Sequence, residues 1–172
     1  YSNTALLYNR GWRGINIDMN QTSVDLFNIF RKRDKNICAA ISNKNKKTVM
    51  YFDHLFSPIN TLDKNFSNIA SKKISFNHHT KKKIYTQKFN EVIQKHNINI
   101  KQIDFINIDV EAHDLEVLEG IDLSIFNAKM ICIEIANNQN NIKDKKLSDY
   151  LNKYNYDLIK IIGLNGFFEL RD

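Results

Sequence analysis

This sequence has little proline, cysteine or tryptophan, and it lacks a long hydrophobic run. One proline and 42% hydrophobic residues exclude a disordered or proline-rich chain. Two cysteines, Cys38 and Cys132, are too few and too far apart for a disulfide framework or a zinc cluster, so we expect buried thiols in a reducing cytoplasm. No apolar run approaches the roughly 18 residues that span a membrane, and the N-terminus has no signal-peptide layout.

The length of 172 residues suits one domain with one core, and we expect residues 1–172 to form it. We expect a cytoplasmic chain without a membrane partner. The sequence begins at Tyr1 rather than at a methionine, so we also expect further sequence upstream. No pattern in the sequence indicates the oligomeric state.

The net charge is +6 and the isoelectric point is near 9.2. An excess of basic side chains is compatible with an anionic partner. However, the denser clusters, 31–35, 44–47 and 81–83, lack the interleaved aromatic residues of a platform that binds single-stranded nucleic acid. We therefore interpret the lysines as solvated faces and loops, and we do not expect a nucleic-acid partner.

Alternating helix and strand patterns predict an α/β fold with a parallel sheet and crossover helices. The predicted strands cover residues 14–18, 36–42, 47–52, 73–77, 103–108, 130–135, 157–162 and 166–170. The predicted helices cover residues 23–33, 87–95, 115–119 and 147–154. We expect a loop over residues 54–69, and a hairpin at the turn Gly-Leu-Asn-Gly between the last two strands.

The stretch 103–121 carries the clearest candidate for chemistry. An apolar strand ends there, and three ionisable residues, Asp109, Glu111 and His113, follow before a short helix. Ligands of open α/β sheets lie at the carboxyl ends of strands. The three side chains have the chemistry to hold a hard cation or to divide acid and base roles. Helix capping and hydrogen bonds to loop amides are the structural alternative.

Two more acids end predicted strands. Asp18 offers two acceptor oxygens to the hydroxyls of a ribose, although a helix cap or turn explains it as well. Glu134 interrupts an otherwise apolar strand, where a carboxylate needs a partner or a cleft.

The segments that carry these acids resemble the FkbM family of S-adenosylmethionine-dependent methyltransferases. The matching stretches are SNTALLYNRGWRGINID (2–18), FRKRDKNICAAIS (30–42), IDFINIDVEAHDLEVLEGID (103–122) and MICIEI (130–135). The resemblance runs in the same order over nearly the whole chain and is weak over residues 48–102. It implies a Rossmann-like class I methyltransferase sheet, mostly parallel with a C-terminal antiparallel hairpin, that lacks its first strand and glycine-rich loop.

The resemblance also implies methyl transfer from S-adenosyl-L-methionine to a hydroxyl of a sugar or small metabolite, so the expected partner is a small-molecule or glycan acceptor. The cofactor-binding positions would be Ser2, Asn3, Thr4, Asp18, Ala40, Ile41 and Asp109. The catalytic positions would be Asp109, Glu111 and His113, and the substrate-binding positions Glu134 and Asn137.

One departure from the family bears on activity. Ala112 stands where the family usually has glycine, and alanine is strained if that turn requires a positive φ. A non-catalytic binding domain of the same fold is therefore the alternative function. A divalent cation held by Asp109 and Glu111 is a further alternative, but the sequence offers no complete set of metal ligands.

Overall fold

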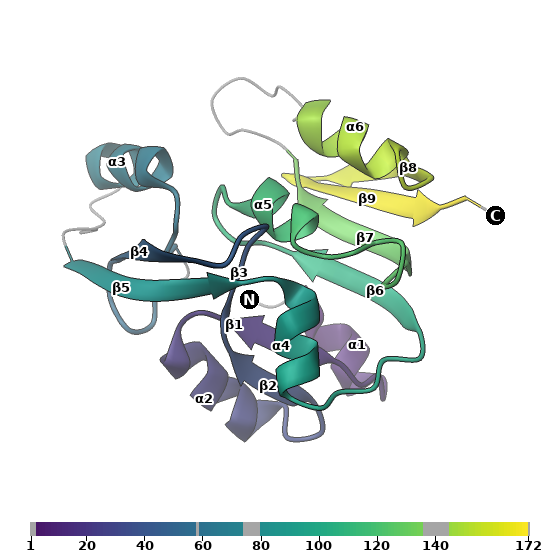
Figure 1. The fold of residues 1–172 in the computed structure, drawn as a ribbon, viewed down its shortest axis with the longest axis horizontal. Helices are drawn as coiled ribbons and strands as arrows, with labels where there is room; N and C mark the ends of the chain where they lie inside the picture. Colours follow the sequence, from purple (N-terminus) through teal and green to yellow (C-terminus); the bar gives the residue numbers. More distant parts are fainter. Residues whose placement is uncertain (1–2, 58, 74–79, 136–144, 172) are drawn as a thin grey trace.

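The chain folds as a mixed α/β structure in a computed structural model of residues 1–172, which describes residues 3–57, 59–73, 80–135 and 145–171 (Figure 1). Its helices are α1 (Ala5–Asn9), α2 (Gln21–Phe30), α3 (Lys64–Lys73), α4 (Phe89–Lys95), α5 (Asp114–Glu119) and α6 (Lys145–Asn152). Its strands are β1 (Ile15–Asp18), β2 (Lys35–Cys38), β3 (Ala40–Ile41), β4 (Lys46–Phe52), β5 (Thr80–Gln87), β6 (Ile103–Ile108), β7 (Ala128–Glu134), β8 (Tyr156–Ile162) and β9 (Asn165–Leu170).

The described strands form three hydrogen-bonded groups, β1-β2, β3-β5-β4 and β6-β7-β9-β8. The pairs β1-β2, β3-β5 and β6-β7 are parallel, whereas β4-β5, β7-β9 and β8-β9 are antiparallel. The expected C-terminal hairpin is confirmed as β8 and β9. The expectation of a mostly parallel sheet is not confirmed, because three of these six described pairings are antiparallel.

Most predicted elements are found within one to three residues of their expected ends, and β6 matches its prediction residue for residue. The predicted strand over residues 36–42 is divided at Ala39, so that β2 pairs with β1 while β3 pairs with β5. The predicted loop over residues 54–69 is wrong from Lys64 onward, where α3 begins. The predicted strand over residues 73–77 is wrong at Lys73, which ends α3, and residues 74–77 lie outside the described residues.

The strand β5 was not predicted. Its sequence, TKKKIYTQ, is rich in lysine and shows no clear alternation of apolar and polar residues. The two cysteines differ in their exposure to solvent. Cys132 is buried as expected, but Cys38, the last residue of β2, is exposed.

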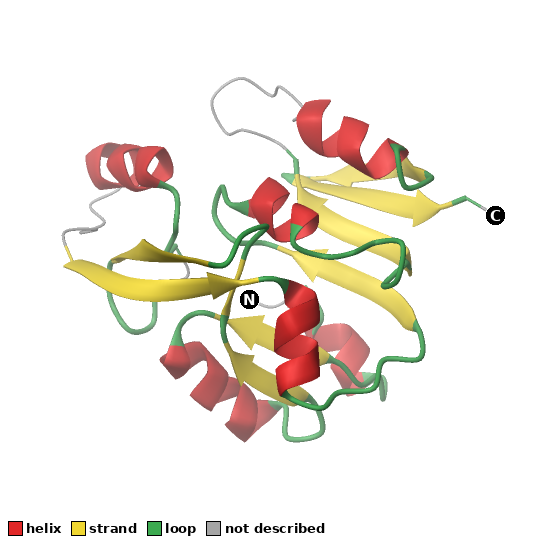
Figure 2. Cartoon of the chain, in the orientation of Figure 1, coloured by secondary structure: helices red, strands yellow, loops and turns green. Residues whose placement is uncertain are grey.

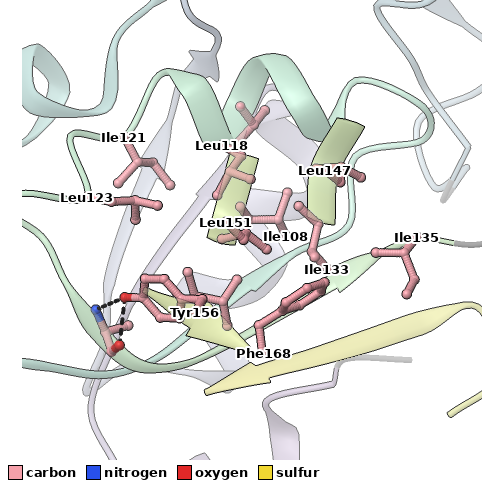
Figure 3. Close-up of a cluster of buried hydrophobic side chains, with 13 residues drawn as sticks. Ile108, Leu118, Ile121, Leu123, Ile133, Ile135, Leu147, Leu151, Tyr156 and Phe168 are labelled. Atoms are coloured by element: carbon pink, nitrogen blue, oxygen red, sulfur yellow. Dashed lines mark hydrogen bonds between the residues drawn. The ribbon is translucent and has the colours of Figure 1, made fainter. Parts of the chain in front are cut away.

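The main core lies between the β6-β7-β9-β8 sheet and the helices α5 and α6, which cover one face of it (Figures 1 and 2). Ile108, Ile133 and Phe168 come from the strands, and Leu118 and Leu151 come from the helices (Figure 3). Tyr156 is completely buried there, and its hydroxyl donates to the carbonyl of Ala128 at 2.7 Å and accepts from its N–H at 2.8 Å. The Tyr156 hydroxyl therefore joins the start of β8 to the start of β7, beside which β6 pairs in parallel.

The helix α5 ends at Gly120 in close contact with the chain that follows β3. A Cβ atom on Gly120 would lie 2.4 Å from the carbonyl oxygen of Ser42, so only glycine permits this approach. The N–H of Phe89 also donates to the carbonyl of Gly120 at 3.1 Å. These contacts join α5 to β3 and to the start of α4.

Candidate active site

Two carboxylates meet where the parallel strands β6 and β7 end. Ile108 lies opposite Ile133 in the register, so Asp109, which follows β6, and Glu134, which ends β7, lie at the same edge of the sheet. Alternate side chains of a strand face the same way. Ile108 and Ile133 point into the core, so Asp109 and Glu134 belong to the opposite face. Burial raises the pKa of both carboxyls, and the Asp109 charge raises that of Glu134 further.

Glu111 lies in the turn that follows and is half-buried. Its pKa is raised from 4.5 to about 7, first by burial and then by the charges of Asp109, Glu134 and Asp114. Every neighbouring charge that shifts this pKa is negative. Glu111 is therefore a carboxyl that exchanges a proton near neutral pH, as a general base requires.

Asp114, the first residue of α5, completes the group and was not singled out from the sequence. It is 5% exposed, and its Oδ1 accepts from the N–H of Val110 at 3.3 Å. Burial, followed by the charge of Glu134, raises its pKa from 3.8 to about 7. An acid in the first helical turn is ordinarily a surface feature, so the only available signal was its position five residues after Asp109.

The turn between β6 and α5 has a strained backbone. Glu111 has a φ of 55° and Ala112 has a φ of 70°, both in the left-handed region that side chains disfavour. The position where glycine was expected does adopt a positive φ. The two left-handed residues turn the chain sharply between β6 and α5, and they bring Glu111 and Asp114 back toward Asp109.

His113 has different partners from the carboxylates. Its Nε2 lies 3.0 Å from the hydroxyl oxygen of Ser42, and its Nδ1 lies 3.6 Å from Glu116. Burial lowers its pKa, and the charge of Lys46 contributes to that shift. The sequence prediction grouped His113 with Asp109 and Glu111, whereas the structure directs its ring toward Ser42 and β4.

Asp18 ends β1 and stands opposite Cys38 in the register with β2. Its Oδ1 accepts from the N–H of Asn20 at 2.7 Å, and burial raises its pKa. The groups that shift this pKa do not include Asp109, Glu111 or Glu134. Asp18 is thus a second candidate carboxylate at the carboxyl end of a parallel strand, and its own pKa shift does not arise from the carboxylates that follow β6.

The other predicted cofactor-binding residues contact different parts of the structure. Asn3 donates to Asn107 at 3.2 Å, and Asn107 lies on the same face of β6 as Asp109. Thr4 instead accepts from Arg31 at 2.8 Å. Ala40 is 6% exposed, and Ile41 packs against the core beside α5. Ser2 and Asn137 lie outside the described residues.

Part of the segment that was expected to form a loop over residues 54–69 connects the two sites. Asn20, just after Asp18, donates to the carbonyl of Leu55 at 2.8 Å. Thr61 donates to the carbonyl of Glu111 at 2.6 Å. At the first attachment and next to it, Leu55 is 51% and Phe56 is 68% exposed. The described parts of this connection, residues 53–57 and 59–61, are called the 53–61 strap below, and they contact the chain after β1 and the chain after β6.

Neither a metal centre nor a membrane span is found in the described part of the chain. No group of three or more His, Cys, Asp or Glu side chains there has positions suited to hold a metal ion. No helix there is long and apolar enough to cross a membrane.

Comparison with known proteins gives one match. The family model described as "Methyltransferase FkbM domain" matches residues 1–158 of the 172. No curated protein and no solved structure matches. The matched range contains β1, the 53–61 strap and all four carboxylates at the ends of β6 and β7.

Proposed function

Because the chain belongs to the FkbM methyltransferase domain family, we propose that it transfers a methyl group from S-adenosyl-L-methionine to a hydroxyl oxygen of a sugar or other small molecule. The observation that carries the proposal is the Glu111 carboxyl, whose pKa is raised to about 7 among three further carboxylates. A hydroxyl acceptor needs a base that is deprotonated at working pH and close to the reacting oxygen.

The residues present suit this methyl donor. S-adenosylmethionine supplies an electrophilic methyl group on a positively charged sulfonium. Asp109 and Glu134 offer negative charge that would favour such a cation, since opposite charges attract strongly at a partly buried site. Asp18 would accept hydrogen bonds from the ribose hydroxyls, and the exposed side chains of Leu55 and Phe56 would cover the adenine.

In this proposal Glu111 removes the proton of the acceptor hydroxyl. Asp109, Asp114 and Glu134 raise its proton affinity, and the left-handed turn fixes its position. We assign His113 a positioning part, because its contact with Ser42 holds the start of α5 against the chain after β3. The small-molecule or glycan acceptor stays a prediction, as does the cytoplasmic location.

We further propose that β1 and β6 flank a common neighbour in a Rossmann-like sheet. Within the described strands, β1 pairs only with β2 and β6 pairs only with β7, so each has one free edge. Their carboxyl ends carry Asp18 and Asp109, and the 53–61 strap connects them. A parallel strand between the two edges would satisfy both sets of backbone groups.

Isothermal titration of S-adenosylmethionine into the full chain tests the donor site. We expect saturable binding, weakened about tenfold or more by Asp18→Asn, because hydrogen bonds to a charged group contribute about 1.5–3 kcal/mol each. The matched control is Asp25→Asn on the exposed side of α2, which should leave the affinity unchanged. Absence of binding at millimolar donor would contradict the proposal.

The alternative is a binding domain of the same fold without methyl transfer, and the strained Ala112 favours it. It predicts donor binding without transfer to any hydroxyl acceptor. Incubation with donor carrying a labelled methyl group and a panel of sugars separates the two, because only the enzyme would move the label.

A further inference from the structure

The antiparallel ribbon of β4 and β5 is the most basic part of the described fold. Its two strands contain Lys46, Lys47, Lys81, Lys82 and Lys83. Figure 1 shows the ribbon extending away from the β6-β7-β9-β8 sheet, with α3 beside its far end. The register of this pair decides how the lysines are arranged.

The pairing alternates lysines with aromatic and apolar residues on one face. Lys47 lies opposite Tyr85, and Tyr51 lies opposite Lys81. Side chains of directly paired residues share a face of the ribbon, and alternate residues along each strand share it too. The six side chains on this face, called the basic-aromatic face below, are Lys47, Val49, Tyr51, Lys81, Lys83 and Tyr85.

The opposite face of the ribbon is covered at Met50 and Phe52, although Lys46 and Lys82 on that face are exposed. Met50 is 3% and Phe52 is 8% exposed there, and the ammonium of Lys82 lies 3.6 Å from the centre of the Phe52 ring. In contrast, Tyr85 on the basic-aromatic face is 52% exposed. Lys47, Lys81 and Lys83 are exposed as well. The basic-aromatic face is therefore available to a partner.

The three lysines of this face have no ion pair with a described residue. Lys81 and Lys83 are two residues apart in an extended strand, about 7 Å along it. An exposed aromatic ring, Tyr85, follows two residues later on the same face. Spaced positive charges beside an exposed aromatic ring suit a flexible polyanion with flat ring units.

This arrangement changes the interpretation of the sequence. The clusters 44–47 and 81–83 contain no aromatic residue, so no nucleic-acid partner was expected from the sequence. The antiparallel register places Tyr51 opposite Lys81, 30 positions away in the chain, and Tyr85 opposite Lys47, 38 positions away. The fold thus places aromatic residues between the lysines, which is the feature of a platform for single-stranded nucleic acid that the two sequence clusters lack.

Protection of a sheet edge is the competing explanation. Apart from residues 86 and 87, which pair with β3, β5 has pairing on one side only among the described strands, and lysines on an edge strand discourage pairing with other chains. That explanation accounts for Lys81–Lys83 but gives no reason for an exposed Tyr85 beside Lys47 on β4.

We propose that the basic-aromatic face binds single-stranded nucleic acid, independently of the proposed methyltransferase activity. Lys47, Lys81 and Lys83 contact backbone phosphates, and Tyr85 stacks on a base, as aromatic platforms do. Binding is noncovalent, tolerant of sequence, and weakened by salt because phosphate contacts release counterions.

Fluorescence anisotropy of the full chain with a labelled oligothymidylate tests the proposal across a series of salt concentrations. We expect the triple variant Lys47→Gln, Lys81→Gln, Lys83→Gln to reduce the slope of log affinity against log salt by about 2, since each phosphate contact contributes about 0.7 for single strands. We expect Tyr85→Ala to weaken binding about tenfold with an unchanged salt slope.

The matched control is Lys32→Gln, Lys95→Gln, Lys101→Gln, which removes the same charge from exposed positions elsewhere. Equal losses in the control and in the ribbon variant would overturn the proposal, because they would indicate attraction by net charge alone. Equal binding of duplex DNA, of polygalacturonate or of phosphatidylserine vesicles would also overturn it, and so would the absence of binding at low salt. A different result would overturn the proposal in favour of edge protection: the triple lysine variant of the ribbon aggregates, and Tyr85→Ala binds with the affinity of the wild type.

Discussion

The hydroxyl of Thr61 donates a 2.6 Å hydrogen bond to the carbonyl oxygen of Glu111, a residue 50 positions later in the chain. Thr61 is fully buried, and its backbone also pairs with Tyr51 on β4. This contact attaches the 53–61 strap to the left-handed turn that carries the proposed base. The middle of the chain, where the sequence match to a family was weakest, thereby takes part in building the candidate site.

Glu111→Gln should abolish most methyl transfer. We expect the turnover rate to fall about 100-fold or more, because the amide cannot accept the acceptor's proton. The wild-type rate should rise with pH around 7, following the raised pKa of Glu111, and the variant should lose this dependence. Rates measured from pH 5 to 9, with titration of donor binding alongside, check both points. Asp104→Asn, an exposed carboxylate near the other end of β6, is the control; a similar loss there would contradict the assignment.

Asp114→Asn should change how stability depends on pH. The pKa of Asp114 is about 7 in the fold and lower when unfolded, so the folded state binds the extra proton. The stability from that proton is complete below about pH 4 and is lost as pH rises through 7. In the variant, the amide oxygen of the side chain still accepts the hydrogen bond from the N–H of Val110, but the side chain carries no charge. We expect it to gain about 2 kcal/mol over the wild type at pH 8 and almost nothing at pH 4.

Urea unfolding of both proteins at the two pH values measures the difference. An equal effect of Asp114→Asn at pH 4 and pH 8 would show that the Asp114 carboxyl is not the source of the pH dependence.

Ala112→Gly should stabilise the fold. Ala112 has a φ of 70°, where a side chain costs about 1–2 kcal/mol and glycine costs none. The added freedom of glycine in the unfolded chain offsets part of this, so we expect a net gain of about 0.5–1 kcal/mol. Ala5→Gly in α1 has no such strain to relieve and should lose a similar amount. Thermal unfolding distinguishes the two signs, and a loss at both positions would argue against strain at Ala112.

Gly120→Ala should disturb the contact between α5 and the chain after β3. The new Cβ would lie 2.4 Å from the carbonyl oxygen of Ser42, and backbone must shift to relieve that clash. We expect a loss of about 1–3 kcal/mol. Gly14→Ala is the matched control, since no atom lies within 4 Å of its added Cβ. Denaturant midpoints compare the two variants, and equal stability would show that the helix end accommodates the side chain without cost.

Local patterns sufficed for elements whose packing agrees with their composition. The apolar run of β6, the acids after it and the amphipathic helices follow from periodicity, because burial on one face selects it. They failed where tertiary pairing overrides composition. The strand β5 is rich in lysine, α3 lies in a polar stretch that resembles a loop, and Cys38 is exposed although it lies in an apolar run.

The sequence by itself determined the family, the apolar strands and the acids that end three of them, because hydrophobic period and residue order are properties of neighbours in the chain. Only the tertiary structure decided which acids act together. It added Asp114 to Asp109, Glu111 and Glu134, and it turned His113 toward Ser42. It also placed tyrosines among the lysines of β4 and β5. Proton affinity and surface charge depend on distances between residues remote in sequence, and strand register and two left-handed residues set those distances.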